Sequence, residues 1–397
     1  MLEYPKQFLN EISAEKLNKE TIKMTLSIIS VFCQYYSDIE PKIEDEKIGE
    51  ILDIIWLIMI YSKDNEEYMT IINKSLSHLI SQSHESQFEF IFNKFMSEIE
   101  KISFNIKEQN DNINHIMVII NSLAILLKNV SGDRKIQIKQ ALPMIISNFT
   151  ILLQQTSKIE LMTNVYNLFT KLINDITYKL RSSEISLILN AVIVISSSSC
   201  EQRILKSNYN IIQIDIIESL FDSIYYLLLS LIRFRQANST VNLISSLHQK
   251  SDMKTFNTPL FPLLSNYGHY LSIHHATNFS RLLSAISQKP STNQVHGHGS
   301  NTNTLTSLSS SAANTKPFIK HIVHILGEYV NIQTSSRPLD PVKKNEIITG
   351  LNALLDLCDE HDREYVLVNL SHANGGKIIF KKLVEEWKKN WKFGGKV

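Results

Sequence analysis

The spacing of apolar residues is the feature that most limits how this chain folds. Between residues 113 and 127, apolar side chains recur at the i, i+3, i+4 and i+7 intervals that place them on one side of an α-helix: Ile113, Ile116, Met117, Ile120, Leu123 and Leu127. Residues 161–173 repeat this pattern, and no stretch has the strict alternation of a half-buried strand. The sequence therefore predicts an all-α protein.

Similar patterns predict helices through most of the chain. They cover residues 20–37, 47–62, 65–82, 86–107, 110–130, 132–155, 157–176, 182–197, 211–235, 237–249, 258–272 and 276–289. With only 11 glycines and 9 prolines in 397 residues, tight hairpins should be few. Helix pairs that each bury one side on the next pair form HEAT- or armadillo-like solenoids. We expect an irregular solenoid of this kind, with a large helical bundle as the alternative that periodicity leaves open.

Three positions predict where helices begin. Ser157 and Asp64 each precede a glutamate by three residues, which is the spacing of a capping box. Asp340 precedes Pro341, and this pair is typical of an N-cap followed by proline in the first helical turn.

A polar stretch between Pro290 and Pro317 interrupts the helical pattern. Serine, threonine and asparagine dominate it and aromatic residues are absent, so it cannot bury enough apolar surface to offset its ordering entropy. We expect a disordered insertion at 290–316. It would separate a helical-repeat-like array at 1–289 from a C-terminal helical segment at 317–397.

The charge and the cysteine content of the chain limit the classes of partner it can bind and indicate the cellular compartment in which it resides. Forty basic and 39 acidic residues give a net charge of +1, so any surface that attracts nucleic acid has to be local. Cys33, Cys200 and Cys358 are too few and too far apart for a disulfide framework, which favours the cytosol or the nucleus. The most apolar runs, Ile54–Tyr61 and Ile224–Ile232, are shorter than a membrane span needs. No membrane partner is expected.

One segment, LNALLDLCDEHDREYV (Leu351–Val366), carries an unusual density of side chains that bind metals or transfer protons. Within seven positions it places Asp356, Cys358, Asp359, Glu360, His361 and Asp362. A helix from Pro341 to about Cys358 would bury the thiol in its last turn and leave the acidic residues at the junction with the next helix. We therefore interpret this segment as a helix junction.

The alternative is a metal-dependent hydrolase that uses four of these side chains: Asp356, Cys358, His361 and Asp362. Cys358 and His361 are three residues apart and share a helix face, but no second pair supplies the ligands that a metal site requires. The ANGGKIIF segment lacks the first glycine of a phosphate-binding loop and has Ile378 where serine or threonine is needed. The sequence thus predicts no enzyme, no cofactor, no bound metal and no small-molecule substrate.

The last helix, in GGKIIFKKLVEEWKKNWKFGGKV, separates aromatic from basic residues. One side carries Phe380, Val384, Trp387 and Trp391. Much of the rest carries Lys377, Lys381, Lys382, Lys388, Lys389 and Lys392. These lysines are candidates for contact with a partner or with RNA phosphates, and the alternative is an ordinary solvated helix surface.

Four segments of the C-terminal third resemble the C-terminal domain of the unhealthy ribosome biogenesis protein 2 family, whose members are nucleolar pre-rRNA processing factors. They are Asn278–Ile286, Pro317–Val330, Leu339–Asp362 and Gly375–Trp387. The resemblance covers about residues 275–391. Its most specific part is GLNALLDLCDEHD, and the residues that carry the family-like motif are Leu354, Leu355, Asp356, Cys358, Glu360, His361 and, in the last helix, Trp387.

The resemblance implies a HEAT-like, non-catalytic scaffold in the nucleolus that takes part in pre-rRNA processing and assembly of the large ribosomal subunit. Its implied partners are other pre-ribosomal assembly factors, with pre-rRNA as a candidate ligand. Proteins of the family are longer and carry this domain at their end, so we expect this chain to correspond to a fragment or a shortened form. A helical-repeat adaptor in transport or trafficking is the alternative function.

Overall fold

A computed structural model describes residues 19–35, 45–104, 113–175, 178, 180–197, 200, 202, 204, 214–238, 271–287, 316–335, 338–370 and 375–393. Every regular element within these ranges is a helix, so the predicted all-α class is confirmed. Nearly all of the helices predicted at 237–249 and 258–272, and of the predicted insertion at 290–316, lies outside the described residues. The chain divides into two compact units, Met1–Leu180 and Arg181–Val397.

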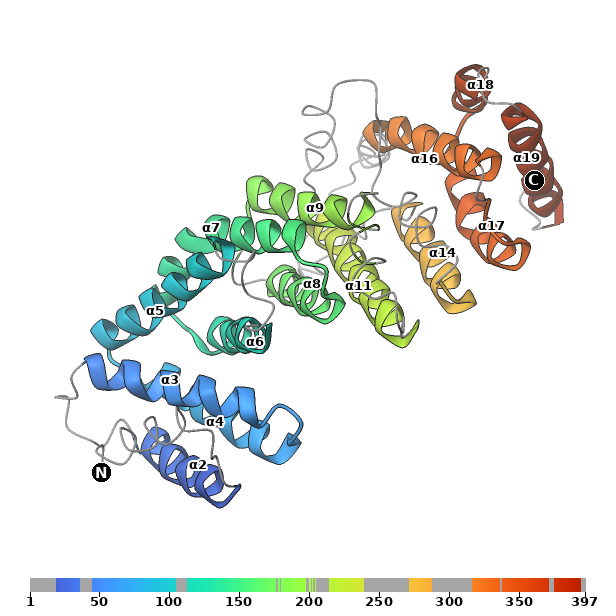
Figure 1. Cartoon of the computed structure of the whole chain (residues 1–397). Helices are drawn as coiled ribbons and strands as arrows, with labels where there is room; N and C mark the ends of the chain where they lie inside the picture. Colours follow the sequence, from blue (N-terminus) through green and yellow to red (C-terminus); the bar gives the residue numbers. More distant parts are fainter. Residues whose placement is uncertain are drawn as a thin grey trace, which may run out of the picture. The chain divides into compact units, whose positions relative to one another are not determined.

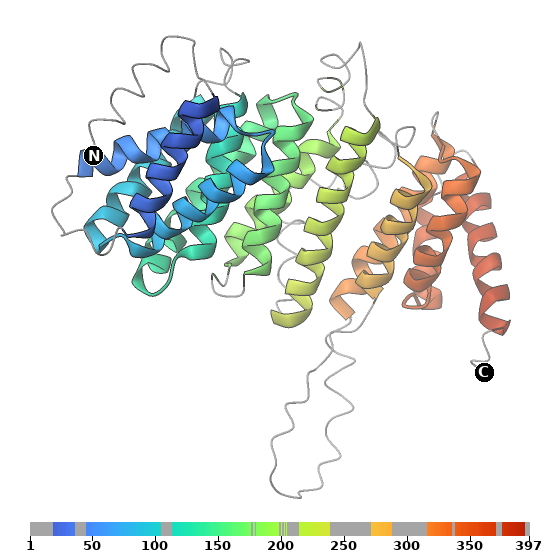
Figure 2. The same cartoon turned by 90° about the horizontal axis from the view of Figure 1, so that it is seen from below.

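The first unit is a stack of helices in two layers (Figures 1 and 2). Its described helices are α2 (Lys19–Gln34), α3 (Asp45–Tyr61), α4 (Glu66–Gln82), α5 (Glu85–Phe104), α6 (Ile113–Asn129), α7 (Asp133–Gln155) and α8 (Ile159–Asn174). Helices α2, α4, α6 and α8 contact one another in that order, and α3, α5 and α7 form a second row. Contact between each helix and the next but one is how helix-pair solenoids bury their apolar sides, which confirms the predicted HEAT- or armadillo-like architecture.

Two of the three predicted helix starts are wrong by one residue. The N-cap of α4 is Asn65, whose side-chain oxygen accepts a hydrogen bond from the Tyr68 N–H at 3.1 Å, and Asp64 lies outside the helix. The N-cap of α8 is Lys158 instead of Ser157. Sequence spacing does not distinguish adjacent capping residues when both are polar, because either side chain or backbone can satisfy the first N–H groups.

The third predicted start is confirmed. Asp340 is the N-cap of α17, and its carboxylate accepts the Val342 N–H at 2.8 Å, with Pro341 as the first helical residue.

Arg134, near the start of α7, binds the end of α4. Its guanidinium donates to the carbonyl of Ile80 at 3.0 Å and to that of Ser83, and it lies 5.0 Å from the ring centre of Phe88. The last carbonyls of a helix have no backbone partner within the helix, and this arginine adds a charged donor to the Ser83 hydroxyl that also donates to the Ile80 carbonyl at 3.0 Å. It thereby joins three helices of the first unit.

Replacing Arg134 by methionine should lower the free energy of unfolding by about 2 kcal/mol, because two carbonyls lose a charged donor while the apolar stem is kept. Urea denaturation followed by circular dichroism measures the change. Arg233→Met on α11 makes the same substitution at an exposed arginine and should change stability by less than about 0.5 kcal/mol. Equal losses in both variants would contradict this role.

Helix α7 is the one described helix that is long and apolar enough, by length and composition, to cross a membrane. Its apolar residues contribute to the core of the first unit, since Ile138, Leu142 and Leu153 are fully buried and the helix contacts α5 and α8. Buried core helices meet the same length criterion.

The second unit carries the segments of greatest functional interest. Its described helices are α9 (Ser182–Ser196), α11 (Ile214–Asn238), α14 (Ile273–Ser287), α16 (Lys316–Thr334), α17 (Pro341–Leu355), α18 (Glu360–Asn369) and α19 (Gly376–Phe393). Helices α11, α14, α17 and α19 contact one another in that order, while α16 contacts α18 and α19. The most extensive contact joins α14 to α17 (Figure 1). Helices α14, α17 and α19 thus repeat the contacts between each helix and the next but one that build the first unit.

Candidate functional site

The segment LNALLDLCDEHDREYV forms the junction between α17 and α18, as predicted. Helix α17 ends at Leu355, three residues before the predicted end, and α18 begins at Glu360. Asp359 is the N-cap of α18: its carboxylate accepts the Asp362 N–H at 2.8 Å, and the Asp362 carboxylate accepts the Asp359 N–H at 3.1 Å. This reciprocal capping box uses two of the acidic residues to start a helix.

Asp356 holds the last helix against this junction. Its carboxylate accepts a hydrogen bond from the indole Nε1 of Trp387 at 2.8 Å. The guanidinium of Arg363 lies 5.1 Å from the centre of the same ring and donates to the carbonyl of Cys358 at 2.5 Å. One tryptophan from α19 is thus held by the end of α17 and the first turns of α18, which fixes three helices around a mostly apolar ring.

Cys358 lies in the turn after α17, not in its last helical turn as predicted, and its thiol is buried. Burial, reinforced by the nearby Asp362 carboxylate, raises the pKa of the Cys358 thiol to about 12. Because the thiolate is the form that attacks electrophiles and binds metals, this cysteine is inert at neutral pH.

The described part of the chain contains no group of three or more His, Cys, Asp or Glu side chains arranged to hold a metal ion. Within the four residues of the hydrolase alternative, Asp356 binds Trp387, Asp362 caps α18, Cys358 is buried and His361 is exposed. These side chains do not converge on one point. The chemistry that this junction supports is helix capping and packing.

The lysines of α19 lie together on its exposed side. Phe380, Leu383 and Trp387 are buried on the other side, with exposed fractions of 0%, 4% and 9%. Five lysines are exposed and, at about 100° per residue, fall within an arc of about 140° opposite the buried residues: Lys377, Lys381, Lys382, Lys388 and Lys389. We call these five residues the lysine face. The side chains of Lys392 and Trp391 lie outside the described part of the structure.

Local sequence explains this arrangement. Apolar and aromatic residues at three- and four-residue intervals direct one side of α19 toward α16 and α17, so the lysines between them face solvent. Lys388 and Lys389 also lie in the second half of the helix, where cations interact favourably with the helix dipole. Glu385 is exposed in the middle of the lysine face and reduces its local positive charge.

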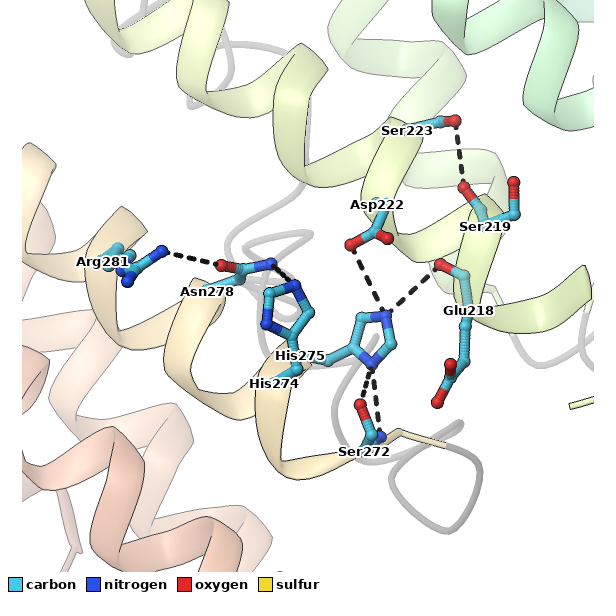
Figure 3. A network of polar contacts seen from close by, with 9 residues as sticks. All are labelled: Glu218, Ser219, Asp222, Ser223, Ser272, His274, His275, Asn278 and Arg281. Atoms are coloured by element: carbon cyan, nitrogen blue, oxygen red, sulfur yellow. Dashed lines mark hydrogen bonds and ion pairs between the residues drawn. The ribbon is translucent and has the colours of Figure 1, made fainter. Parts of the chain in front are cut away.

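A second polar cluster joins α11 to α14 around the buried His275 (Figure 3). Its Nδ1 lies 3.3 Å from the Ser272 backbone N–H group and 2.7 Å from the Ser272 hydroxyl. Its Nε2 lies 3.3 Å from the Glu218 carbonyl and 3.6 Å from the Asp222 carboxylate. Accepting a backbone N–H at Nδ1 places the proton on Nε2, which then donates toward α11.

The cluster has the residue types of a nucleophilic triad but the geometry of a helix start. Ser272 directly precedes α14, and its own backbone N–H faces the same ring nitrogen as its hydroxyl. His275 accepts the backbone N–H of Ser272, as the glutamate of a capping box accepts the backbone N–H of an N-cap residue. Its role is to join two helices.

These contacts differ in how far the sequence could have predicted them. The interval between Ser272 and His275 has capping-box spacing and was predictable. Asp356 and Arg363 contact Trp387 across 31 and 24 positions of the sequence, so no local pattern predicts these contacts.

Comparison with known proteins identifies the second unit and the end of the first. A sequence model of the Urb2/Npa2 family matches residues 163–396, which is more than half of the 397 residues and includes every helix from α9 to α19. No curated protein and no solved structure matches the chain. The matched region contains both the capped junction and the lysine face. The chain belongs to the Urb2/Npa2 family of ribosome biogenesis factors.

Proposed function

We propose that this chain is a non-catalytic scaffold in the nucleolar assembly of the large ribosomal subunit, where it binds other assembly factors and pre-rRNA. The family match over residues 163–396 carries the proposal. A stacked helical array supports it, because such arrays expose wide surfaces on which several partners can be held at once. The contacts at the α17–α18 junction also support it, since they use the reactive side chains for structure.

The lysine face is the surface that we assign to RNA. It offers five exposed positive charges along one helix, and phosphate recognition requires clustered charge without base-specific geometry. Trp387, held by Asp356, fixes the helix that presents these charges. A rigid support of this kind reduces the ordering cost of binding.

Removing three charges from the lysine face should weaken binding of pre-rRNA fragments at least about ten-fold at physiological salt. The variant is Lys377→Gln, Lys381→Gln and Lys388→Gln, and the measurement is fluorescence anisotropy over a range of salt concentrations. The slope of log affinity against log salt should decrease by about 2, because each lost phosphate contact on a single strand contributes about 0.7. Glu385→Gln should strengthen binding, since it removes the one negative charge in the middle of this face.

The matched control replaces three exposed lysines of the first unit in the same way: Lys74→Gln, Lys158→Gln and Lys171→Gln. It should leave affinity and salt slope unchanged. If both triple variants lose affinity equally, binding follows net charge and the lysine face is not the RNA site.

The scaffold itself is tested by affinity purification of the tagged chain from growing cells, with identification of bound proteins and sequencing of bound RNA. Recovery of large-subunit assembly factors together with pre-rRNA is the expected result. Recovery of membrane-coat or transport proteins without ribosomal precursors would refute the proposed function.

A further inference from the structure

Helix α18 exposes apolar side chains that the described residues of the chain leave uncovered. Of its ten residues only Val366 is buried. Val368 and Tyr365 are 66% and 52% exposed, and both belong to the same side of the helix. Tyr365 makes an edge contact with His324 of α16, at 6.5 Å between ring centres, which orients the tyrosine and leaves much of it accessible.

Two carboxylates border this apolar strip. Glu360 and Glu364 are exposed and lie one turn apart on the flank of Val368, within an arc of about 80° at about 100° per residue. The other charged groups nearby already have contacts: Asp359 and Asp362 cap the helix, and Arg363 lies against Trp387. We call Glu360, Glu364, Tyr365 and Val368 the α18 face.

The α18 face differs in kind from the lysine face. Its negative charge opposes RNA, whereas its apolar residues with carboxylates along one flank complement an apolar strip with basic residues along one flank. Ten residues of helix span about 15 Å, which matches about three turns of a docked helix. We propose that the α18 face is the docking site for a basic amphipathic helix of a partner protein. This inference deepens the proposed function, on which it rests for the identity of the partner as an assembly factor.

The direct test uses pure components. The probe is a synthetic amphipathic helical peptide of leucines flanked by lysines, and its counterpart has glutamate in place of every lysine. Fluorescence anisotropy with the full chain should detect saturable binding of the basic peptide only. Val368→Ser should weaken this binding at least ten-fold, because it removes the centre of the apolar strip from an exposed position without disturbing the core.

Charge reversal tests the acidic flank. The variant Glu360→Lys with Glu364→Lys should lose affinity for the basic peptide at least ten-fold and gain affinity for the acidic counterpart. The matched control is Glu85→Lys with Glu89→Lys on α5, where two exposed glutamates have the same spacing and the first also begins its helix. It should bind the basic peptide like the original chain.

Three results would overturn the inference. The first is equal loss of peptide affinity in the α18 variants and in the α5 control, which would indicate non-specific attraction. The second is self-association of the original chain in sedimentation velocity that the α18 variants abolish, because the occupant would then be a second copy. The third is loss of RNA affinity in Val368→Ser, which would assign the face to RNA.

Peptide binding with pure components can succeed even where cellular purification yields no pre-ribosomes. Failure of the docking site and failure of the scaffold function are therefore distinguishable.

Discussion

Replacing Gly350 by alanine is expected to lower the free energy of unfolding of the second unit by about 3 kcal/mol, because it forces α14 and α17 apart. A Cβ atom at this position would lie 2.5 Å from the Ser280 carbonyl oxygen and 2.8 Å from the Leu283 Cβ. The first neighbour is backbone, so a side-chain rotation cannot relieve the overlap. The Gly350 N–H also donates to the Ser280 hydroxyl at 2.9 Å, and the separation would break this bond as well.

The matched control is Gly327→Ala on α16. Nothing lies within 4 Å of a Cβ added there, so this variant should gain up to about 1 kcal/mol from the better helix propensity of alanine. Urea denaturation followed by circular dichroism, fitted with a separate transition for each compact unit, measures both changes. A neutral Gly350→Ala would mean that the two helices are not in close contact in solution.

Replacing Trp387 by alanine is expected to have the larger effect, a loss of about 3 to 5 kcal/mol, which is the range for removing a buried aromatic side chain. The indole is 9% exposed, contributes to the contact of α19 with the preceding helices, and donates to Asp356. Its removal also takes the indole hydrogen bond from the Asp356 carboxylate and the ring contact from the Arg363 guanidinium. RNA affinity should decrease in the same variant, because the lysine face loses its rigid support.

Trp387→Phe separates the two contributions of this side chain. Phenylalanine keeps most of the apolar contact and the aromatic surface under Arg363 but cannot donate to Asp356. Its expected cost is about 1.5 to 3 kcal/mol, the value of one hydrogen bond to a charged group. An unchanged melting temperature in Trp387→Ala would instead place the aromatic side of α19 on the surface.

The sequence by itself determined those features that depend on neighbours within about one helical turn. Apolar spacing was sufficient for the all-α class, for the side of α19 that carries the lysines, and for the interpretation of LNALLDLCDEHDREYV as a helix junction. The Asp340–Pro341 start was predictable because both its donor and its acceptor lie within three residues. The family resemblance, which depends on short segments, was found at the same level and is confirmed by the match over residues 163–396.

Only the tertiary structure decided which elements meet. Nothing local in the sequence indicates that Gly350 lies against Ser280, which is 70 residues away. The contacts between Asp356 and Trp387 and between His275 and Glu218 join residues 31 and 57 positions apart. The start of α4 likewise depended on which of two adjacent polar residues, Asp64 or Asn65, faces the first N–H groups of the helix. Apolar periodicity predicts that a helix has a buried side, but it does not predict which helix covers that side. The hydrophobic effect is non-directional, and many helices offer equivalent apolar surfaces. Close backbone approach, indole hydrogen bonds and charge pairing selected among those surfaces, and they act only between residues that the fold has already brought together.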